Sequence, residues 1–153
     1  MADDPADADV PAVREHGIKL LARREHAPRE LERKLCDRGY AAATVAEALA
    51  GLIRDDLLSE ARYAESFARQ RAERGQGRVR IRAELTQRGV GDGHIDQALA
   101  ELDVDWAASA RAQRAKRFGP DLPDSLRERA RQTRFLQQRG FDSDDIRAVL
   151  RGE

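Results

Sequence analysis

The sequence predicts an all-α protein, an elongated array of three tandem three-helix repeats, and three observations favour this fold class. An Arg-Gly pair recurs at Arg38, Arg88 and Arg139, 50 and then 51 residues apart. Apolar residues stand at matched positions before and after each pair. Charged residues make up 37% of the chain and aromatic residues 5%, and no long segment alternates with the period of two that is typical of strands. Three copies are also about the number that stacked repeats need for stability.

Each Arg-Gly pair is predicted to end a helix. A helix that ends with a left-handed glycine often closes on an apolar contact between the residue after the glycine and a residue of the last turn. The same spacing of leucine, glycine and apolar residue occurs at all three pairs. The residues to which we assign this structural role are Gly39, Gly89, Gly140, Leu35, Leu85, Leu136, Tyr40, Val90 and Phe141.

Two more helices are predicted in every repeat. After each stop, two apolar residues four positions apart indicate a helix with one buried face, because such residues share one side of a helix. These pairs are Val45 with Leu49, Ile95 with Leu99, and Ile146 with Leu150. A further helical stretch comes before each stop helix, at about residues 13–25, 58–74 and 105–118. The chain is therefore predicted to contain nine helices.

The first part of the chain divides into a tail and a repeat. Residues 1–12 contain four aspartates among alanines and two prolines, which is typical of a disordered acidic tail. The first repeat spans residues 13–53, with Ile18 on the apolar face of its first helix. Pro28 suits the opening turn of the second helix, and Thr44 is expected to cap the third as part of a capping box.

The second repeat is assigned to residues 54–102 and the third to residues 103–153. Leu126 is expected on the apolar face of the middle helix of the third repeat. The predicted N-caps of these two repeats are Ser59, Asp92, Asp124 or Ser125, and Ser143.

No residue pattern indicates catalysis or ligand binding by a small site. His16, His26 and His94 have no paired spacing to one another or to cysteine, so a metal site is not predicted. Cys36 is the only cysteine, which excludes an internal disulfide, and it is interpreted as a small buried apolar residue. We therefore predict a protein that is not an enzyme and needs no cofactor and no metal.

The chain contains no signal for a membrane. It has no apolar run long enough to span a bilayer, and its amino terminus is acidic where a signal peptide would be basic and then apolar. We expect a cytoplasmic protein, and a monomer.

Charge is balanced in total but segregated along the chain. There are 28 basic and 28 acidic residues. Seven arginines and two acids lie within 62–82, eight arginines, one lysine and three acids within 111–139, and five acids within 92–105. The basic runs fit either solvated helix faces or a surface for a polyanionic or acidic partner. Composition alone fits solvated faces, but two features make the second interpretation plausible: the arginines are not interleaved with acids at i+4 spacing, and two basic runs recur in successive repeats.

A central block of the sequence resembles the RecX family of bacterial recombination regulators. The block consists of Asp55-Asp56, Arg62-Tyr63-Ala64-Glu65-Ser66-Phe67, Arg71, Gly75-Gln-Gly77-Arg-Val-Arg80-Ile81-Arg82, Glu84-Leu85 and Arg88-Gly89-Val90. The flanks support the resemblance in order, with Leu20-Leu21, Arg24, His26, Glu30-Leu31 and Lys34-Leu35 before it, and Asp105-Trp106, Ala110-Arg111, Phe118-Gly119, Arg134-Phe135-Leu136 and Arg139-Gly140-Phe141 after it. The resemblance covers about residues 13–151.

The resemblance implies an all-helical modulator of three repeats without a catalytic site. RecX proteins bind the RecA filament and restrain its ATPase, strand-exchange and coprotease activities. The resemblance therefore implies an inhibitor that lies in the helical groove of RecA on DNA. Gln76 and Arg78 depart from the family pattern, in which an aromatic or apolar residue and a proline are common at these positions.

We expect the basic residues of the second and third repeats to bind the filament. The candidate partner-binding residues are Arg62, Arg69, Arg71, Arg74, Arg78, Arg80, Arg82, Arg88, Arg111, Arg114, Lys116 and Arg117. Two alternatives stay open. One is a free-standing nucleic-acid-binding helical protein, or at least weak binding of single- and double-stranded DNA as an accessory property, and the other is a helical scaffold for an unrelated protein partner.

Overall fold

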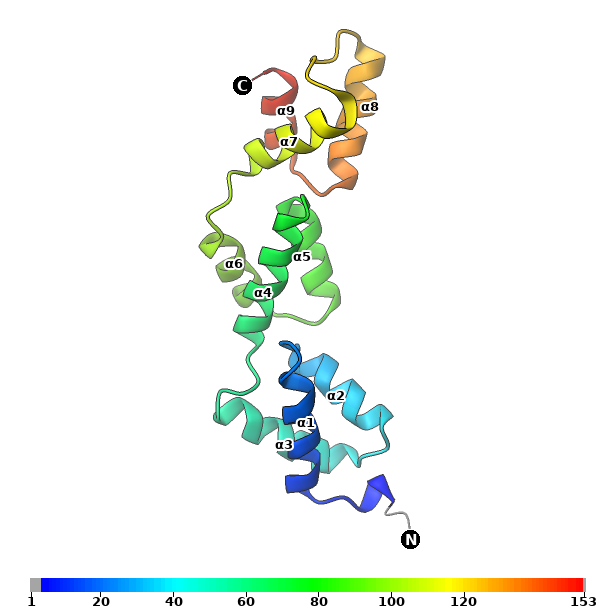
Figure 1. Ribbon diagram of the computed structural model, residues 1–153, viewed down its shortest axis with the longest axis vertical. Helices are drawn as coiled ribbons and strands as arrows, with labels where there is room; N and C mark the ends of the chain where they lie inside the picture. The colour runs from blue at the N-terminus through cyan, green and yellow to red at the C-terminus, as the bar shows by residue number, and fades with distance from the viewer. Residues whose placement is uncertain (1–3, 153) are drawn as a thin grey trace.

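The computed structural model describes residues 4–152, which form an elongated stack of three three-helix modules (Figure 1). Within these residues there are nine α-helices and one short 3-10 helix, and there is no strand. The predicted fold class, an all-α array of three tandem three-helix repeats, is confirmed. No helix between residues 4 and 152 combines the length and the apolar character needed to cross a bilayer.

The modules follow one another in chain order from one end of the stack to the other. Module 1 contains the 3-10 helix Pro5–Asp7, α1 (Val10–Leu21), α2 (Pro28–Asp37) and α3 (Ala42–Arg54). Module 2 contains α4 (Glu60–Glu73), α5 (Arg78–Gln87) and α6 (Asp92–Glu101). Module 3 contains α7 (Trp106–Phe118), α8 (Leu126–Gln138) and α9 (Ser143–Leu150).

The three Arg-Gly stops close in the same way. Gly39, Gly89 and Gly140 have φ values of +102°, +81° and +93°, a region that glycine enters without steric cost. After each glycine, the next N–H donates to the carbonyl of the leucine five residues earlier, at 3.1 to 3.4 Å. This is the hydrogen bond of a Schellman motif. The three leucines are fully buried, so each stop also anchors its helix in the core of its module.

Each module has its own apolar core. The core of module 1 is centred on Leu31, Leu35 and Leu52, and that of module 2 on Ile81 and Leu85. The core of module 3 is smaller and contains Leu136, Phe141 and Ile146. Trp106, the first residue of α7, packs against the cores of both module 2 and module 3, so the stack is held by apolar as well as polar contacts.

The structure corrects two expected apolar positions. Ile18 is 39% exposed, because α1 buries Val13 and Gly17 instead. The missing side chain of Gly17 lets Leu52 approach so closely that an added Cβ would lie 3.0 Å from Leu52 Cδ1. Leu126 is 86% exposed, because the buried residues of α8 begin only further along the helix.

Three expected N-caps are also corrected. Thr44, Asp92 and Ser143 lie inside the first turns of α3, α6 and α9, because each helix begins earlier than expected. In α9 the cap is Asp142, whose carboxylate accepts from the N–H of Asp145 at 2.9 Å. The caps predicted at Ser59 and Ser125 are confirmed, because each side chain accepts a backbone N–H of the first turn.

The predicted tail is structured over the part that the structure describes. Asp4 accepts from the N–H of Ala6 at 2.9 Å and caps the 3-10 helix. Asp9 accepts from the N–H of Ala12 at 3.0 Å and caps α1, which already begins at Val10. Two of the aspartates that suggested disorder, Asp4 and Asp9, therefore act as helix caps. Residues 1–3 of the predicted tail, and Glu153 of the third repeat, lie outside the described residues.

Candidate partner-binding surface

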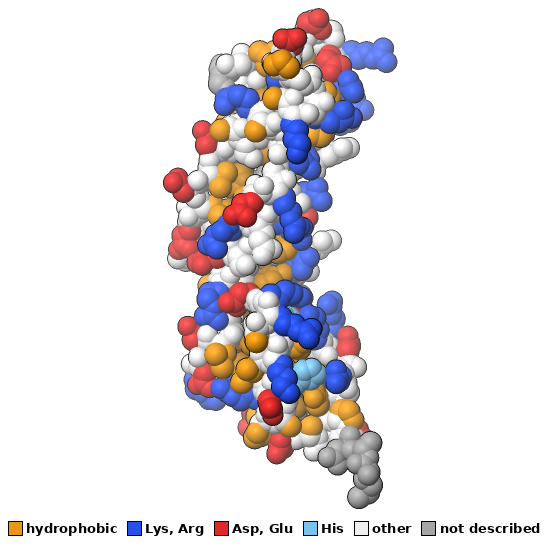
Figure 2. Space-filling model, in the orientation of Figure 1, with side chains coloured by type: hydrophobic (Ala, Val, Ile, Leu, Met, Phe, Trp, Pro, Cys, Tyr) orange, Lys and Arg blue, Asp and Glu red, His pale blue; other side chains and the backbone are white. Residues whose placement is uncertain are grey.

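The middle helices of the modules, α2, α5 and α8, follow one another along one edge of the stack (Figure 1). Many basic side chains lie along this edge, whereas acidic side chains gather on the opposite side of the central module (Figure 2). The charge segregation seen in the sequence is therefore also a segregation in space.

Two backbone hydrogen bonds join module 2 to module 3. The N–H of Gly77 donates to the carbonyl of Arg139 at 2.8 Å, and the N–H of Val79 donates to that of Gly140 at 2.9 Å. The first N–H groups of a helix have no partner within the helix, and here the stop of α8 supplies partners for the start of α5. A Cβ on Gly77 would lie 2.4 Å from the carbonyl carbon of Gly140, and one on Gly140 would lie 2.2 Å from Arg80 Cβ. The contact therefore requires glycine on both sides.

Side chains make most of the junction between module 1 and module 2. Arg62 Nε donates to Glu25 Oε1 at 2.9 Å, and Arg62 Nη1 lies 3.0 Å from Asp56 Oδ1. Ala27, which precedes α2, is buried in the core of module 2. Arg62, a predicted partner-binding residue, thus holds two modules together.

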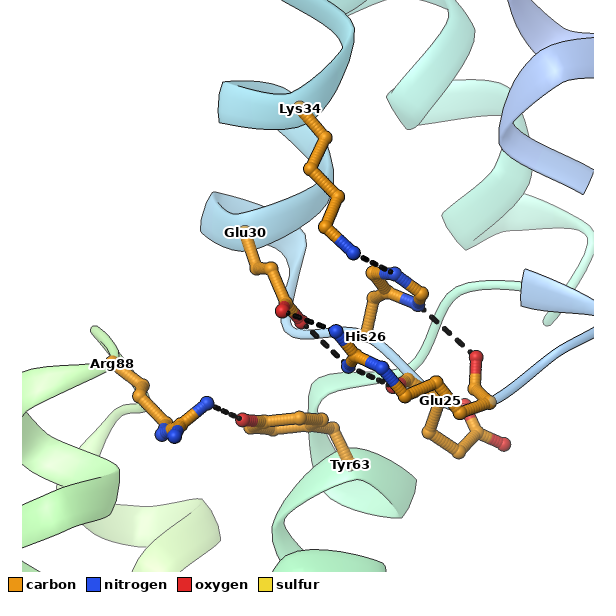
Figure 3. A network of polar contacts seen from close by, with 7 residues as sticks. Glu25, His26, Glu30, Lys34, Tyr63 and Arg88 are labelled. Carbon is orange, nitrogen blue, oxygen red and sulfur yellow. Dashed lines mark hydrogen bonds and ion pairs between the residues drawn. The ribbon is translucent and has the colours of Figure 1, made fainter. Parts of the chain in front are cut away.

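A polar network lies beside this junction, and His26 is at its centre (Figure 3). The ring is 1% exposed, its Nδ1 is 3.1 Å from the carbonyl of Arg24, and its Nε2 is 3.0 Å from Lys34 Nζ. Because a carbonyl only accepts and an ammonium only donates, His26 is the neutral tautomer with its proton on Nδ1. Burial lowers the pKa of His26, and the positive charges of Arg24 and Lys34 lower it further.

The structure corrects the expectation that the central arginines lack acidic neighbours. Arg80 and Glu84 form an i,i+4 pair at 3.1 Å, and Arg71 reaches the same carboxylate at 3.4 Å. Other partners come from distant helices, so counting along one helix does not find them. Among the described residues, the ion pairs of these arginines are Arg62 with Glu25 and Asp56, Arg71 and Arg80 with Glu84, Arg78 with Asp142 and Asp145, and Arg82 with Asp96.

Arg114 does not belong to a partner surface. Its side chain is buried, and its guanidinium donates to the carbonyls of Gly119, Pro120 and Asp121 at 2.9 to 3.3 Å. It also donates to Gln132 Oε1 at 3.3 Å. Arg114 therefore closes the loop between α7 and α8, which corrects its assignment to the partner-binding set.

Arg69 lies on the acidic side of the molecule. It lines a surface groove of about 510 Å³ between α4 and the end of α6, together with Glu65 and Glu101. A hydrogen bond and charge repulsion from Glu101 raise the pKa of Glu65. The remaining exposed residues of the predicted set are Arg74, Arg88, Arg111, Lys116 and Arg117.

A row of arginines nevertheless crosses all three modules, and we call it the basic path. It consists of Arg29, Arg33, Arg88, Arg71, Arg80, Arg134, Arg131, Arg127 and Arg117. At its first end, Arg29 and Arg33 of α2 share a surface groove of about 440 Å³ with Arg88 of module 2. Arg29 also covers the stop of α5, because a Cβ on Gly89 would lie 2.9 Å from Arg29 Cδ.

Contacts continue the basic path from module 2 to module 3. The guanidinium carbons of Arg88 and Arg71 lie 4.8 and 4.6 Å from the ring centroid of Phe67. Arg71 and Arg80 meet at Glu84, as described above. Arg80 Nη1 then reaches the carbonyl of Gln138 at 3.5 Å, and Gln138 lines a pocket of module 3 together with Arg134.

The basic path includes five residues that the sequence reasoning missed. They are Arg29, Arg33, Arg127, Arg131 and Arg134. A signal for them existed, because Arg29 with Arg33, and Arg127 with Arg131 and Arg134, have the i, i+4 and i+7 spacing that places side chains on one side of a helix. The predicted residues that are not on the path are Arg62, Arg69, Arg74, Arg78, Arg82, Arg111, Arg114 and Lys116, so the predicted set and the path overlap only in part.

Comparison with known proteins agrees with the three-module architecture. The first, second and third three-helix domains of RecX match residues 14–52, 59–99 and 103–150. The chain is 52% identical over 144 residues to regulatory protein RecX of Halorhodospira halophila (strain DSM 244 / SL1), covering 94% of this chain and 89% of that one. It is 49% identical over 145 residues to regulatory protein RecX of Pseudomonas entomophila (strain L48), covering 94% of each.

Two solved structures have the same fold. The crystal structure of RecX from Lactobacillus salivarius matches with a TM-score of 0.80 at 22% identity, over 94% of this chain and 96% of that one. A crystal structure of regulatory protein RecX matches with a TM-score of 0.81, also at 22% identity, over 94% of this chain and 73% of that one. With its three modules matched in order and close relatives over most of its length, this chain belongs to the RecX family of regulatory proteins.

Proposed function

We propose that this chain is a negative regulator of the RecA recombinase, which binds in the groove of the RecA–DNA filament and inhibits its ATPase, strand-exchange and coprotease activities. Family membership supports RecA as the target. The observation that carries the proposed contact surface is the basic path, because it continues across all three modules on one elongated molecule.

The shape of the molecule suits a repetitive partner. A stack of three modules presents its binding residues along its length, so that it can contact more than one filament subunit at once. Several weak contacts on one molecule add to a strong one when the geometry lets them form together. A molecule held in this way occupies the groove and excludes substrates and further subunits from it.

The first end of the basic path is suited to bind an anionic partner. Among residues 4–152, no carboxylate is paired with Arg29 or Arg33, whereas Arg71 and Arg80 share Glu84. An arginine without an internal partner can pair with an acidic side chain or a phosphate without first breaking an ion pair. We therefore place a principal contact at Arg29 and Arg33.

Charge reversal at these two positions tests the proposal. We expect the double variant Arg29→Glu with Arg33→Glu to require at least about tenfold more protein to inhibit the ATPase of RecA on single-stranded DNA, equivalent to about 1.4 kcal/mol of binding free energy. The matched control is Lys19→Glu with Arg54→Glu, which makes the same charge change on α1 and α3, away from the basic path. The control should inhibit like the parent protein.

Unchanged inhibition by the α2 variant, with its fold verified by circular dichroism, would contradict the proposed contact. Equal loss in the control would show that only total charge matters. Binding of the parent protein to RecA filaments should also exceed its binding to bare DNA, and the reverse order would favour a free-standing nucleic-acid-binding protein.

A further inference from the structure

The basic path ends in module 3 at a pocket that combines basic and aromatic side chains. It is a surface hollow of about 420 Å³ between the last turn of α7 and one side of α8. Its lining includes four arginines and two phenylalanines, namely Arg117, Arg127, Arg131, Arg134, Phe118 and Phe135. We call it the module 3 pocket.

The positive charge of this pocket is largely uncompensated. Its only acidic lining residue is Glu128, which pairs with Arg131 at 3.2 Å. Within residues 4–152, Arg117, Arg127 and Arg134 have no carboxylate within ion-pair distance. This differs from α5, where Arg78, Arg80 and Arg82 all have acidic partners, as described above. The module 3 pocket therefore offers positive charge that is free to attract an anion.

Aromatic rings form the apolar part of the pocket. Phe118 and Phe135 meet edge to face, with ring centroids 5.2 Å apart, and both rings are partly exposed. The guanidinium carbons of Arg117 and Arg131 lie 5.4 and 5.1 Å from the centroid of Phe118. Phe118 is not part of the buried core of module 3. Planar guanidinium groups against aromatic rings offer flat, cationic surfaces.

We propose that the module 3 pocket binds single-stranded nucleic acid. The guanidinium groups of Arg127 and Arg134 pair with phosphates, while an unpaired base stacks on the layer formed by Phe118 and its neighbouring arginines. Proteins that bind single strands combine a positive groove for the backbone with aromatic side chains for the bases. This site goes beyond the proposed function, because it requires no RecA.

The combination of charge and flat surfaces favours a single strand over other anions. In a duplex the bases are stacked on one another, so it offers phosphates but no free base to stack in the pocket. An acidic peptide offers carboxylates, but it makes no general use of a stacking surface. The partly exposed rings thus favour a single strand over a duplex or an acidic peptide, although all three carry negative charge.

Fluorescence anisotropy with a labelled single-stranded oligothymidylate, in the absence of RecA, tests the site. For Arg127→Gln with Arg134→Gln we expect at least about tenfold weaker binding. The slope of log K against log salt concentration should also become shallower by about 1.4, since each of the two lost phosphate contacts contributes about 0.7. For Phe118→Leu we expect at least about fivefold weaker binding with an unchanged salt slope, because stacking is lost and charge is kept. The control Arg129→Gln with Arg151→Gln should bind like the parent protein.

Three outcomes would overturn the proposal. The first is parent-like binding and salt slope for the Arg127 and Arg134 variant. The second is equal loss in the control, which would show binding by overall charge. The third is displacement of the oligonucleotide by polyglutamate as effectively as by unlabelled single strand, which would identify the pocket as a site for acidic peptides. A duplex of the same length should compete less well than the single strand, and thermal unfolding should verify the fold of every variant.

Discussion

At the scale of single residues, His26 shows how a buried polar network in module 1 can depend on one proton. Its ring accepts from Lys34 through Nε2, which is possible only while that nitrogen carries no proton. A second proton would place an imidazolium against an ammonium in a buried position. The network in Figure 3 is therefore compatible with neutral His26 only.

Acid should weaken the protein through this group. Because the pKa of His26 is lowered in the folded state, the unfolded chain binds more protons near the ordinary histidine pKa of 6.5, and stability falls as the pH falls through that value. We expect the free energy of unfolding by urea to be lower at pH 5.5 than at pH 7.5. In His26→Gln this difference should shrink, whereas the control His94→Gln, at an exposed position, should keep it. An undiminished difference in His26→Gln would contradict the assignment.

The roles of the arginines show where prediction from the sequence ends. The spacing of Leu35, Gly39 and Tyr40 predicts a helix stop because a Schellman motif is a local structure. The partner of Arg78 is Asp142, 64 residues away, and its position depends on how two modules are rotated against each other. Burial of Arg114 likewise depends on the path of a loop. Local spacing contains no information on such contacts, so the sequence alone does not predict which arginines are engaged within the protein.

At the scale of elements, the stop of α8 ends a helix and also joins two modules. Its carbonyls accept the first N–H groups of α5, so the end of one helix satisfies the start of another. Gly77 is an N-cap with φ of −84°, a value that any residue adopts. Its restriction to glycine is therefore a matter of space and not of backbone conformation.

Adding one methyl group at this position should separate the two modules. We expect Gly77→Ala to lower the free energy of unfolding by about 1–3 kcal/mol more than Gly91→Ala, because the new Cβ meets backbone atoms of Gly140. Gly91 is the matched control: it is the N-cap of α6 with φ of −69°, and no atom lies within 4 Å of an added Cβ. Urea unfolding measures both variants. Equal losses would show that the close contact is not needed for stability.

At the scale of the whole molecule, the two junctions differ in kind. Modules 2 and 3 are joined by backbone hydrogen bonds and by Trp106, which packs in both cores. Modules 1 and 2 meet at the ion pair of Arg62 with Glu25, at Ala27, and where Arg29 covers Gly89. Exposed ion pairs are weak and are screened by salt. We therefore expect modules 2 and 3 to move as one rigid body, and module 1 to move more freely relative to them.

Small-angle X-ray scattering measures this difference. The radius of gyration of the parent protein should clearly exceed the roughly 15 Å of a compact domain of this length. Arg62→Ala should increase it and broaden the distance distribution, because the ion pair between Arg62 and Glu25 of module 1 is lost. Arg78→Ala removes an ion pair at the other junction but leaves the backbone hydrogen bonds of Gly77 and Val79, so its scattering should match that of the parent. If both variants scatter alike, the two junctions are equivalent.

The three middle helices begin in three different ways, and this difference determines the order in which the modules can follow one another. Helix α2 begins with Pro28, which has no N–H to satisfy, α5 uses carbonyls of its neighbour, and α8 uses the hydroxyl of Ser125. If the modules exchanged places, a helix that begins with a proline or a serine would lie against the carbonyls that accept the N–H groups of Gly77 and Val79 in the native order. The modules are thus alike in shape but not interchangeable, and their order along the chain is encoded at the first residues of these helices.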